Sequence, residues 1–458
     1  MPNPKIPHPP RLPFLGNTHQ IMGKEVVANM LKVTKENAPI FEFSMSGHKD
    51  IYICNNELAD SVLTSPHFHK AVSKPMQQIR NFGGDGLFTA WSHEPNWQKA
   101  HNILMPGFSR NAILSYFPIM VGCINQLMDT WRTKHAGQLI DIQGDMNKLT
   151  FDVIGLCGFD YSFEGFTKEE THPFVHAMEL ALNESVKRAF IPAPIRALRF
   201  QKNKKYWASA NYMANLVDEI IQHRKANPDS SKTDFLNLML QSVDKDTGEQ
   251  LSDENVRYQI VTFLAAGHET TSGLLSFAFY ELLRNPEYLA KAKAEAAELL
   301  ANGTDAISMK DLNKLDFLRK FLMETLRLYP PVFMFTVYAD KDTTIGAKQY
   351  PVKEKQMVRV FTYHIHRDKA VWGENADQFD PENFDLSRMA KRKKTTFLAF
   401  GSGQRTCIGQ HFALMEAMLT ICMVLQNFDL ELAEGYQFEL ANNVTLRPKD
   451  LKIRVTPK

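Results

Sequence analysis

The sequence lacks the features that mark membrane-spanning and exported proteins. Its most apolar stretch, residues 260–283, contains His268 and Glu269, whose burial in hydrocarbon would be costly, so a buried helix of a soluble protein explains it better. The N-terminus has no continuous apolar run of the signal-peptide kind, and its prolines forbid an early helix. We therefore expect a cytoplasmic protein with no membrane anchor.

Cysteine is scarce and the net charge is small. The five cysteines are odd in number and form no CxxC pair, which argues against a disulfide framework or a structural zinc site and fits a reducing compartment. The 53 basic residues nearly balance the 51 acidic ones, so the net charge of +2 gives no reason to expect nucleic acid as a partner. The absence of internal repeats and low-complexity linkers favours one large domain over residues 1–458.

The residues that are present predict a large helical body with small flanking sheets. With 44% apolar residues, the chain can bury a large core. Helical spacing prevails over residues 97–300 and again over 311–329, where Pro330-Pro331 ends the helix. Short strands are expected at residues 40–43, 51–53 and 357–361 and near the C-terminus, where Leu451, Ile453 and Val455 alternate. The fold class is therefore α+β and mainly α-helical.

The most informative segment runs from Phe400 to Gly409, FGSGQRTCIG, and a helical apolar run follows it. Cys407 should therefore lie at a helix N-terminus, where the helix dipole favours a thiolate, which is a strong iron ligand. The glycines at 401 and 403 let the backbone turn tightly and approach a flat cofactor, and Arg405 has donors for a propionate. A lone cysteine is otherwise most often a small buried filler.

This segment resembles the signature loop of the cytochrome P-450 family, FxxGxRxCxG, whose fixed positions are filled by Phe400, Gly403, Arg405, Cys407 and Gly409. With each residue type at about one in twenty, a chance match in a chain of this length is on the order of one in ten thousand. The resemblance implies the cytochrome P-450 fold and haem b, with Cys407 as the ligand of the iron.

Two further segments match the family. Ala266-Gly-His-Glu-Thr-Thr271 resembles the oxygen-binding helix, in which Glu269 and Thr270 would relay protons, and a threonine that bonds back to the carbonyl four residues earlier is a compatible reading. Glu324 and Arg327 match the ExxR element, a buried pair that braces the fold, whereas an isolated pair at this spacing is more often solvated. The family's later Pro-Glu-Arg-Phe stretch reads Pro-Glu-Asn-Phe here, so Asn383 replaces the usual arginine.

Basic and aromatic residues outside these motifs complete the expected cofactor site. Trp97 and His101 lie four apart, on one helical face, and both have donors for a propionate, although an interfacial aromatic beside an exposed histidine is the plainer reading. The run 391–394, Lys-Arg-Lys-Lys, is ordinarily a solvated turn. Its functional reading is that it steers an acidic flavoprotein toward the cysteine side of the haem.

Over nearly the whole chain the sequence is similar to the haem domain of bacterial self-sufficient fatty-acid hydroxylases, in which a flavin reductase follows. That resemblance implies a monooxygenase that hydroxylates medium- to long-chain fatty acids at subterminal carbons with O2, and that receives electrons from an NADPH-dependent reductase carrying FMN and FAD. The reductase would be a separate protein or a missing part of a fusion, since this chain ends at Lys458. The implied substrate residues are His48 and Tyr52 at the channel mouth, Phe88 as a gate, and Met76, Ile79, Leu264, Ala266, Val332 and Val444 along the channel.

Three alternatives stay open at the level of the sequence. A peroxide-driven peroxygenase or an isomerase on the same scaffold needs no reductase, and Glu269 with Thr270 argues against it. A non-catalytic haem carrier or gas sensor is disfavoured by the same polar residues beside Gly267. A cysteine-nucleophile hydrolase lacks a histidine partner motif for Cys407.

Overall fold

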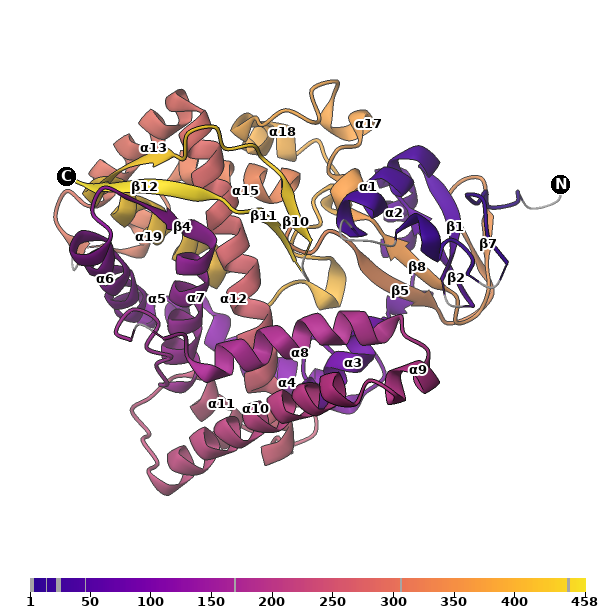
Figure 1. Ribbon diagram of the computed structural model, residues 1–458, viewed down its shortest axis with the longest axis horizontal. Coiled ribbons are helices and arrows are strands. Elements are labelled where there is room, and N and C mark those ends of the chain that lie inside the picture. The colour runs from indigo at the N-terminus through magenta and orange to yellow at the C-terminus, as the bar shows by residue number, and fades with distance from the viewer. Residues whose placement is uncertain are drawn as a thin grey trace. The chain divides into compact units, whose positions relative to one another are not determined.

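Helices dominate the computed structural model, and the strands form small separate sheets, as the sequence predicts (Figure 1). The structure describes residues 4–13, 15–21, 26–45, 47–168, 170–304, 307–442 and 445–458. Backbone contacts divide the chain into two units. The first comprises Met1–Ser73, Met323–Cys407 and Leu440–Arg447, and the second comprises Lys74–Leu322, Ile408–Glu439 and Pro448–Lys458.

The first unit is built on a five-stranded sheet. Its strands, in spatial order, are β1 (Ile40–Met45), β2 (His48–Ile53), β8 (Met357–Val360), β5 (Phe335–Ala339) and β3 (Phe68–Lys70). β1 and β2 form a hairpin through Gly47, whose φ of +78° suits glycine, and β2 pairs in parallel with β8. The expected strands at 40–43, 51–53 and 357–361 are thus confirmed.

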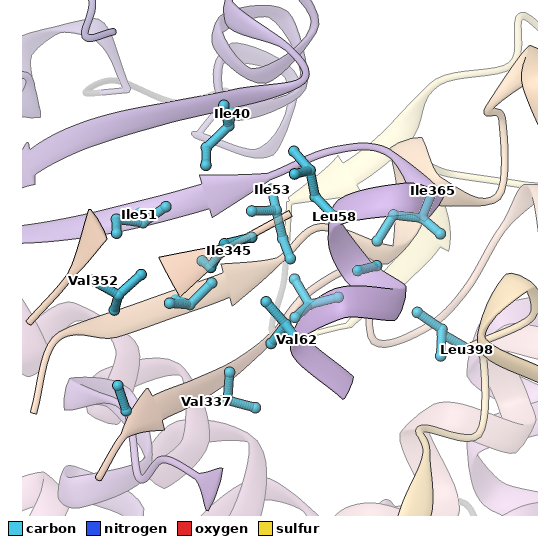
Figure 2. Close-up of a cluster of buried hydrophobic side chains, with 14 residues drawn as sticks. Ile40, Ile51, Ile53, Leu58, Val62, Val337, Ile345, Val352, Ile365 and Leu398 are labelled. Carbon is cyan, nitrogen blue, oxygen red and sulfur yellow. The ribbon is translucent and has the colours of Figure 1, made fainter. Parts of the chain in front are cut away.

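Side-chain alternation gives this sheet two different faces. One face carries branched aliphatic residues such as Ile51, Ile53 and Val358, which pack with Leu58 and Val62 of α2 (Asn56–Leu63) in a buried core (Figure 2). The opposite face carries aromatic and charged residues. The side chain of Asn55 accepts a hydrogen bond from the Leu58 amide and so begins α2 in a defined place.

Short elements fill the rest of the first unit. They are η1 (Thr18–Gln20), α1 (Val26–Asn37), β6 (Thr343–Ile345), β7 (Tyr350–Val352), α16 (Thr362–Ile365), α17 (Lys369–Trp372), η4 (Pro381–Phe384), α18 (Leu386–Met389), η5 (Lys394–Thr396), η6 (Gly403–Arg405), β10 (Leu440–Asn442) and β11 (Leu446–Pro448). β6 pairs with β7 and β10 with β11. α15 (Asp316–Leu328) begins in the second unit and ends in the first, just before the two prolines.

The second unit is a helical body. Its helices are α3 (Lys74–Gly83), α4 (Pro95–Leu104), η2 (Met105–Phe108), α5 (Arg110–Ser115), α6 (Phe117–Lys134), α7 (Ile142–Phe159), α8 (Pro173–Ala189), α9 (Ala193–Ala197), α10 (Phe200–Ala226), α11 (Phe235–Gln241), α12 (Asp253–Arg284), α13 (Pro286–Leu299), α14 (Met309–Leu312) and α19 (Gln410–Asn427). α12 is the long central helix and packs against α3, α7, α10 and α19. It contains the apolar stretch that was expected to form a buried helix.

A three-stranded sheet at the edge of the second unit joins distant parts of the chain. Its order is β4 (Gln138–Asp141), β12 (Lys452–Pro457) and β9 (Phe428–Leu432), all antiparallel. Ile453 and Val455 are buried and their neighbours exposed, as the alternation near the C-terminus predicts. Within the described residues, the stretch Arg110–Lys134 is long and apolar enough to cross a membrane, but half of its most apolar window is buried, as in a core helix.

Candidate active site

The loop that carries Cys407 is closed by its own backbone. The Cys407 amide donates to the Phe400 carbonyl over 2.8 Å, and Gly401 and Gly403 adopt φ values of +77° and +65°. These left-handed conformations are readily open only to glycine, which explains the glycines of this loop. Gln410 begins α19 three residues after the cysteine, as expected.

Cys407 differs from the other cysteines of the chain in its exposure. All five cysteines lie in the described residues, and Cys407 alone is exposed. Burial raises the pKa of the Cys123 thiol to about 12, and it also raises the pKa of the other three buried thiols, at positions 54, 157 and 422, well above the usual value. Buried thiols of this kind stay protonated and inert, so Cys407 carries the one accessible sulfur among the five cysteines.

Glu324 and Arg327 form a fully buried ion pair on α15. Two parallel contacts of 2.6 and 2.7 Å join the guanidinium to the carboxylate. Arg327 also donates to the carbonyls of His366, Ala376 and Gln378, and Glu324 accepts from the Asp380 amide. Such complete pairing makes burial of two charges tolerable, and it ties His366 and the stretch 376–380 of the first unit to one helix.

Asn383 and Arg392 complete this network in place of the arginine that the family usually carries. The Asn383 amide donates to Glu324 Oε1 over 3.1 Å. Arg392 donates in turn to the Asn383 carbonyl over 2.5 Å, and its guanidinium lies 4.2 Å from the centre of the Trp372 ring. Within the run 391–394, Arg392 is therefore partly buried and Lys393 pairs with Asp60, so the run is not simply a solvated turn.

His366 connects this network to the cysteine loop. Its Nε2 accepts from the Leu398 amide over 2.8 Å, so Nδ1 carries the proton and donates to the Arg327 carbonyl over 3.0 Å. The imidazole stacks on Phe397, which makes an edge contact with Phe400 at the start of the loop. Burial lowers the pKa of His366 to about 3, so the ring stays neutral. No local pattern in the sequence indicates this histidine.

The polar segment of α12 leaves the helix unbroken. Thr270 donates to the Ala266 carbonyl over 2.7 Å, the back-bonding that the sequence allows, and both residues are half-buried, as is Glu269. His268 is turned the other way. It lies 4.1 Å from the Phe151 ring of α7, and burial lowers its pKa to about 4. The polar groups of this segment thus separate into two kinds. His268 is neutral and packs on α7, whereas Glu269 and Thr270 are partly exposed.

The loop before Phe88 is fixed against the face of α12 that carries Ala266 and Thr270. The Leu87 amide donates to Gln259 Oε1 over 2.9 Å, and a Cβ at Gly86 would lie 2.2 Å from Thr262 Oγ1. Positions 259, 262, 266 and 270 share one helical face, so the Phe88 loop and Thr270 lie along the same side of α12. Phe88 is large and apolar yet 38% exposed. A rigid loop therefore presents an aromatic ring along the helix that carries Thr270.

The remaining expected site residues are placed as follows. Trp97 and His101 lie on α4 with ring centres 5.1 Å apart, and Trp97 is buried. On α3 Met76 is half-buried and Ile79 buried, and on α12 Leu264 is fully buried. Val332 is 38% exposed in the first unit. Val444 lies outside the described residues.

The two residues expected at a channel mouth have different surroundings. His48 is exposed at the start of β2. Tyr52 is fully buried and stacks on Phe41 at 5.1 Å between ring centres, and burial raises its pKa to about 12. Its neighbour across the sheet, Arg359, is held by Asp50 at 2.7 Å. His48 therefore offers an accessible polar group, whereas the Tyr52 ring is enclosed.

The sequence model of one protein family matches residues 6–455, and its description is cytochrome P-450. The chain belongs to the cytochrome P-450 family. It is 41% identical over 453 residues to bifunctional cytochrome P-450/NADPH–P-450 reductase 2 of Bacillus subtilis, and that match covers 99% of this chain and 42% of the relative. A bifunctional relative from Bacillus cereus is 41% identical over 454 residues, and this match also covers 99% of this chain and 42% of the relative. A self-sufficient cytochrome P-450 monooxygenase of Phanerodontia chrysosporium is 38% identical over 454 residues, and the match covers 99% of this chain and 43% of that relative.

These matches leave more than half of each relative without a counterpart here, because the chain spans about 42% of the length of the bacterial proteins.

Haem is the cofactor of the family, and the P-450 chain offers a donor set that fits it. The loop presents an exposed cysteine, and Gly403 four residues before it is also exposed, so no side chain at that position covers the loop. A thiolate sulfur suits haem iron.

Proposed function

We propose that this cytochrome P-450 is the haem part of a monooxygenase that hydroxylates fatty acids or similar long apolar molecules. One atom of O2 enters a C–H bond, the other leaves as water, and two electrons and two protons balance the reaction. The electrons come from an NADPH-dependent flavoprotein reductase, as the names of the bifunctional relatives suggest. The single observation that carries the proposal is the exposed Cys407 in its closed glycine loop.

The residues of the chain have separate tasks in this proposal. Haem held by a cysteine thiolate supplies the oxygen-activating chemistry, because electron donation from sulfur favours O–O cleavage. Cys407 binds the iron, and Arg405, Trp97 and His101 have donors for the propionates. The Thr270 hydroxyl, which already donates to the Ala266 carbonyl, still has lone pairs to accept a proton and pass it on, with Glu269 as the neighbouring proton source.

Substrate selection rests on the Phe88 loop and the apolar side chains of α3 and α12. The rigid attachment of this loop to Gln259 keeps the exposed Phe88 ring in place, so an alkyl chain meets a fixed apolar wall. A carboxylate at the far end of the chain would have His48 as its accessible partner. A histidine lacks the bidentate donor fork of an arginine, and we therefore propose that apolar contacts dominate binding.

Carbon monoxide difference spectroscopy of the reduced protein tests the axial ligand. We expect the red-shifted band of a thiolate-bound haem in the wild type and its loss in Cys407→Ser. Cys422→Ala is the matched control, since it removes a buried sulfur from the following helix and should keep the band. A wild type that binds no haem, or a Cys407→Ser variant with an unchanged band, would refute the proposal.

Titration with acids and alcohols of equal chain length tests the substrate class. Binding displaces water from the iron and shifts the haem spectrum, so the dissociation constant is read directly. We expect affinity to rise with chain length and to differ little between acid and alcohol, with Phe88→Ala weakening both. A strong preference for the acid that vanishes in His48→Ala would show that an ionic anchor dominates instead.

A further inference from the structure

A small cavity lies in the second unit, between α7, α8 and the loop that joins them. Its volume is about 130 Å³, and its apolar walls are Phe151 of α7, Phe163 of the loop and Val175 of α8. The two phenylalanine rings meet edge to face, with 5.1 Å between their centres. An apolar cavity of roughly 150 Å³ is large enough to hold benzene. The cavity therefore has the size and the walls for one six-membered ring.

Polar groups that line this cavity have hydrogen-bonding capacity to spare. Lys148 of α7 and Glu179 of α8 are partly exposed, and neither forms an ion pair with another described residue. The side-chain oxygen of Asn147 accepts from Gln143 and Ser272, but its Nδ2 donates to no group in the described part of the chain. The cavity thus offers two donors and one acceptor beside its apolar walls.

His172 also lines the cavity and adds no charge to it. Its Nδ1 accepts from the Phe174 amide over 3.2 Å, so Nε2 carries the proton and donates to the Tyr161 hydroxyl over 3.3 Å. Burial lowers the pKa of this histidine, so the ring is neutral at pH 7. The ring meets Phe163 edge to face at 5.3 Å between centres and so extends the aromatic wall.

The pair of opposite charges selects a neutral ligand that carries a hydroxyl. A carboxylate would be attracted by Lys148 but repelled by Glu179, and an ammonium would meet the reverse arrangement. A hydroxyl both donates and accepts, so it can donate to Glu179 while it accepts from Lys148 or Asn147. An aromatic ring suits the walls, because aromatic rings pack well edge to face. A phenol combines these properties.

Two residues that line the cavity also contact α12. The Phe151 ring lies 4.1 Å from the His268 ring between centres, and the Asn147 side chain accepts from the hydroxyl of Ser272. These contacts reach α12 on either side of residues 269–270. A ligand that holds Phe151 and Asn147 in place would therefore restrain this segment of α12 as well.

We propose that this cavity, here called the α7–α8 pocket, binds a small phenol, and that the bound ring braces α7 against segment 268–272 of α12. The pocket is distinct from the face of α12 that the Phe88 loop approaches, because His268 points toward α7. Binding of the phenol does not depend on the reaction of the haem.

Fluorine NMR titration of the haem-loaded chain with 4-fluorophenol tests the site. Val175→Phe fills the cavity and should abolish binding, whereas Val243→Phe, at a valine that is 56% exposed, should bind like the wild type. An unchanged carbon monoxide band shows that each variant keeps its haem site. Binding that is lost in Phe88→Ala but kept in Val175→Phe would place the phenol in the substrate channel and overturn the proposal.

The chemistry of the ligand is tested with variants of the polar groups and with related rings. Glu179→Gln should weaken phenol binding by about fivefold, because the hydroxyl loses a charged acceptor, and the exposed control Glu431→Gln should not. Toluene, benzoate and benzylamine carry the same ring, and each should bind more weakly than phenol. Tighter binding of benzoate or benzylamine, or equal binding by all variants, would contradict the assigned ligand.

Hydrogen exchange measures the link to α12. Bound phenol should slow amide exchange in segment 143–151, which carries one wall of the pocket, and in segment 268–272. The Val175→Phe variant should show neither change on addition of phenol. Exchange that slows in segment 143–151 alone would overturn the bracing of α12, and absence of any binding by the wild type would overturn the whole proposal.

Discussion

At the scale of single residues, a buried network of paired polar groups braces the chain around the cysteine loop. Glu324, Arg327, His366 and Asn383 each make at least two hydrogen bonds in the first unit, although all are buried. An unpaired member would cost more than the pairing contributes, so this network is sensitive to deletion of any one group. It specifies the path of the chain that leads to Cys407.

The first prediction concerns Arg392. Arg392→Ala removes the hydrogen bond to the Asn383 carbonyl and the contact with the Trp372 ring, and we expect the free energy of unfolding to fall by about 1–3 kcal/mol. Adding Asn383→Arg to that variant should recover part of the loss, because the longer cation lies beside Glu324. Denaturant unfolding of the haem-loaded protein measures both.

Arg388→Ala is the control for this prediction, because Arg388 forms an exposed pair with Asp380 and should contribute little. If Arg392→Ala and Arg388→Ala were equally stable, Arg392 would be only part of a solvated run. Failure of Asn383→Arg to restore any stability would show that the site no longer accepts the arginine common in the family.

The second prediction concerns pH and His366. Its pKa falls from 6.5 in the unfolded chain to about 3 in the folded protein, so the unfolded state binds the extra proton first as pH drops. Its contribution is complete above pH 6.5 and is lost as pH falls toward 3, with a slope of about 1.4 kcal/mol per pH unit. His366→Gln should be less stable at neutral pH and should show a shallower decline below it.

Unfolding free energies measured across that pH range test this slope. His223→Gln, which changes an exposed histidine, should keep the decline of the wild type. His268, whose pKa is about 4, contributes in the same direction and should keep part of the decline in the His366 variant. An identical slope in wild type and His366→Gln would mean that this ring is not the group that titrates.

At the scale of elements, α12 organises the candidate site of the second unit. One of its faces packs on α7 through His268, and another carries Gln259, Ala266 and Thr270. The Phe88 loop approaches this second face closely enough that glycine is required at position 86. Contacts between a loop and a rigid helix position a substrate wall more precisely than a free loop would.

The third prediction tests the close contact between the Phe88 loop and α12. Gly86→Ala introduces a Cβ 2.2 Å from Thr262 Oγ1 and 2.9 Å from the Tyr258 carbonyl, so the loop must move. We expect a loss of about 1–3 kcal/mol in unfolding free energy and a weaker spectral response to fatty acids. Gly83→Ala is the control, because its nearest atom would lie at 3.7 Å. Unchanged substrate affinity in Gly86→Ala would separate this loop from the substrate.

At the scale of the whole molecule, surface charge is sorted although the total is close to zero. The stretch between Glu184 and Asp218, which has seven basic residues and no acidic one, belongs to one unit, and the run 391–394 belongs to the other. Within that run Arg392 donates to the Asn383 carbonyl and Lys393 forms an ion pair with Asp60. Lys391 and Lys394 are exposed. These two lysines are the groups available to an acidic partner.

The fourth prediction concerns the exposed lysines of the run 391–394. Lys391→Gln/Lys394→Gln should slow reduction of the haem by the reductase of a bifunctional relative at low salt, with little difference at high salt. Stopped-flow reduction under carbon monoxide measures the rate. The control Lys341→Gln/Lys348→Gln should behave like the wild type. A rate that does not depend on salt would count against electrostatic steering by this run.

Local patterns sufficed for some of these features and failed for others. Strand alternation, the glycines of the cysteine loop and the three-residue spacing of Glu324 and Arg327 act over a few residues, so the sequence indicates them directly. His366 and Arg392 carry no local signal, because their partners lie at Leu398 and Asn383 and depend on how loops pack. The roles of Tyr52 and His48 in substrate binding stay predictions.

The amino-acid sequence by itself therefore determined the family and the α+β class, and it singled out Cys407 among the five cysteines, because short motifs with fixed spacing report backbone geometry. Tertiary structure decided which polar groups are paired, that Tyr52 is enclosed and that Cys407 stays exposed whereas the other cysteines are buried. Those outcomes depend on contacts between residues far apart in the chain, and burial and hydrogen bonding across such distances arise only when the elements pack.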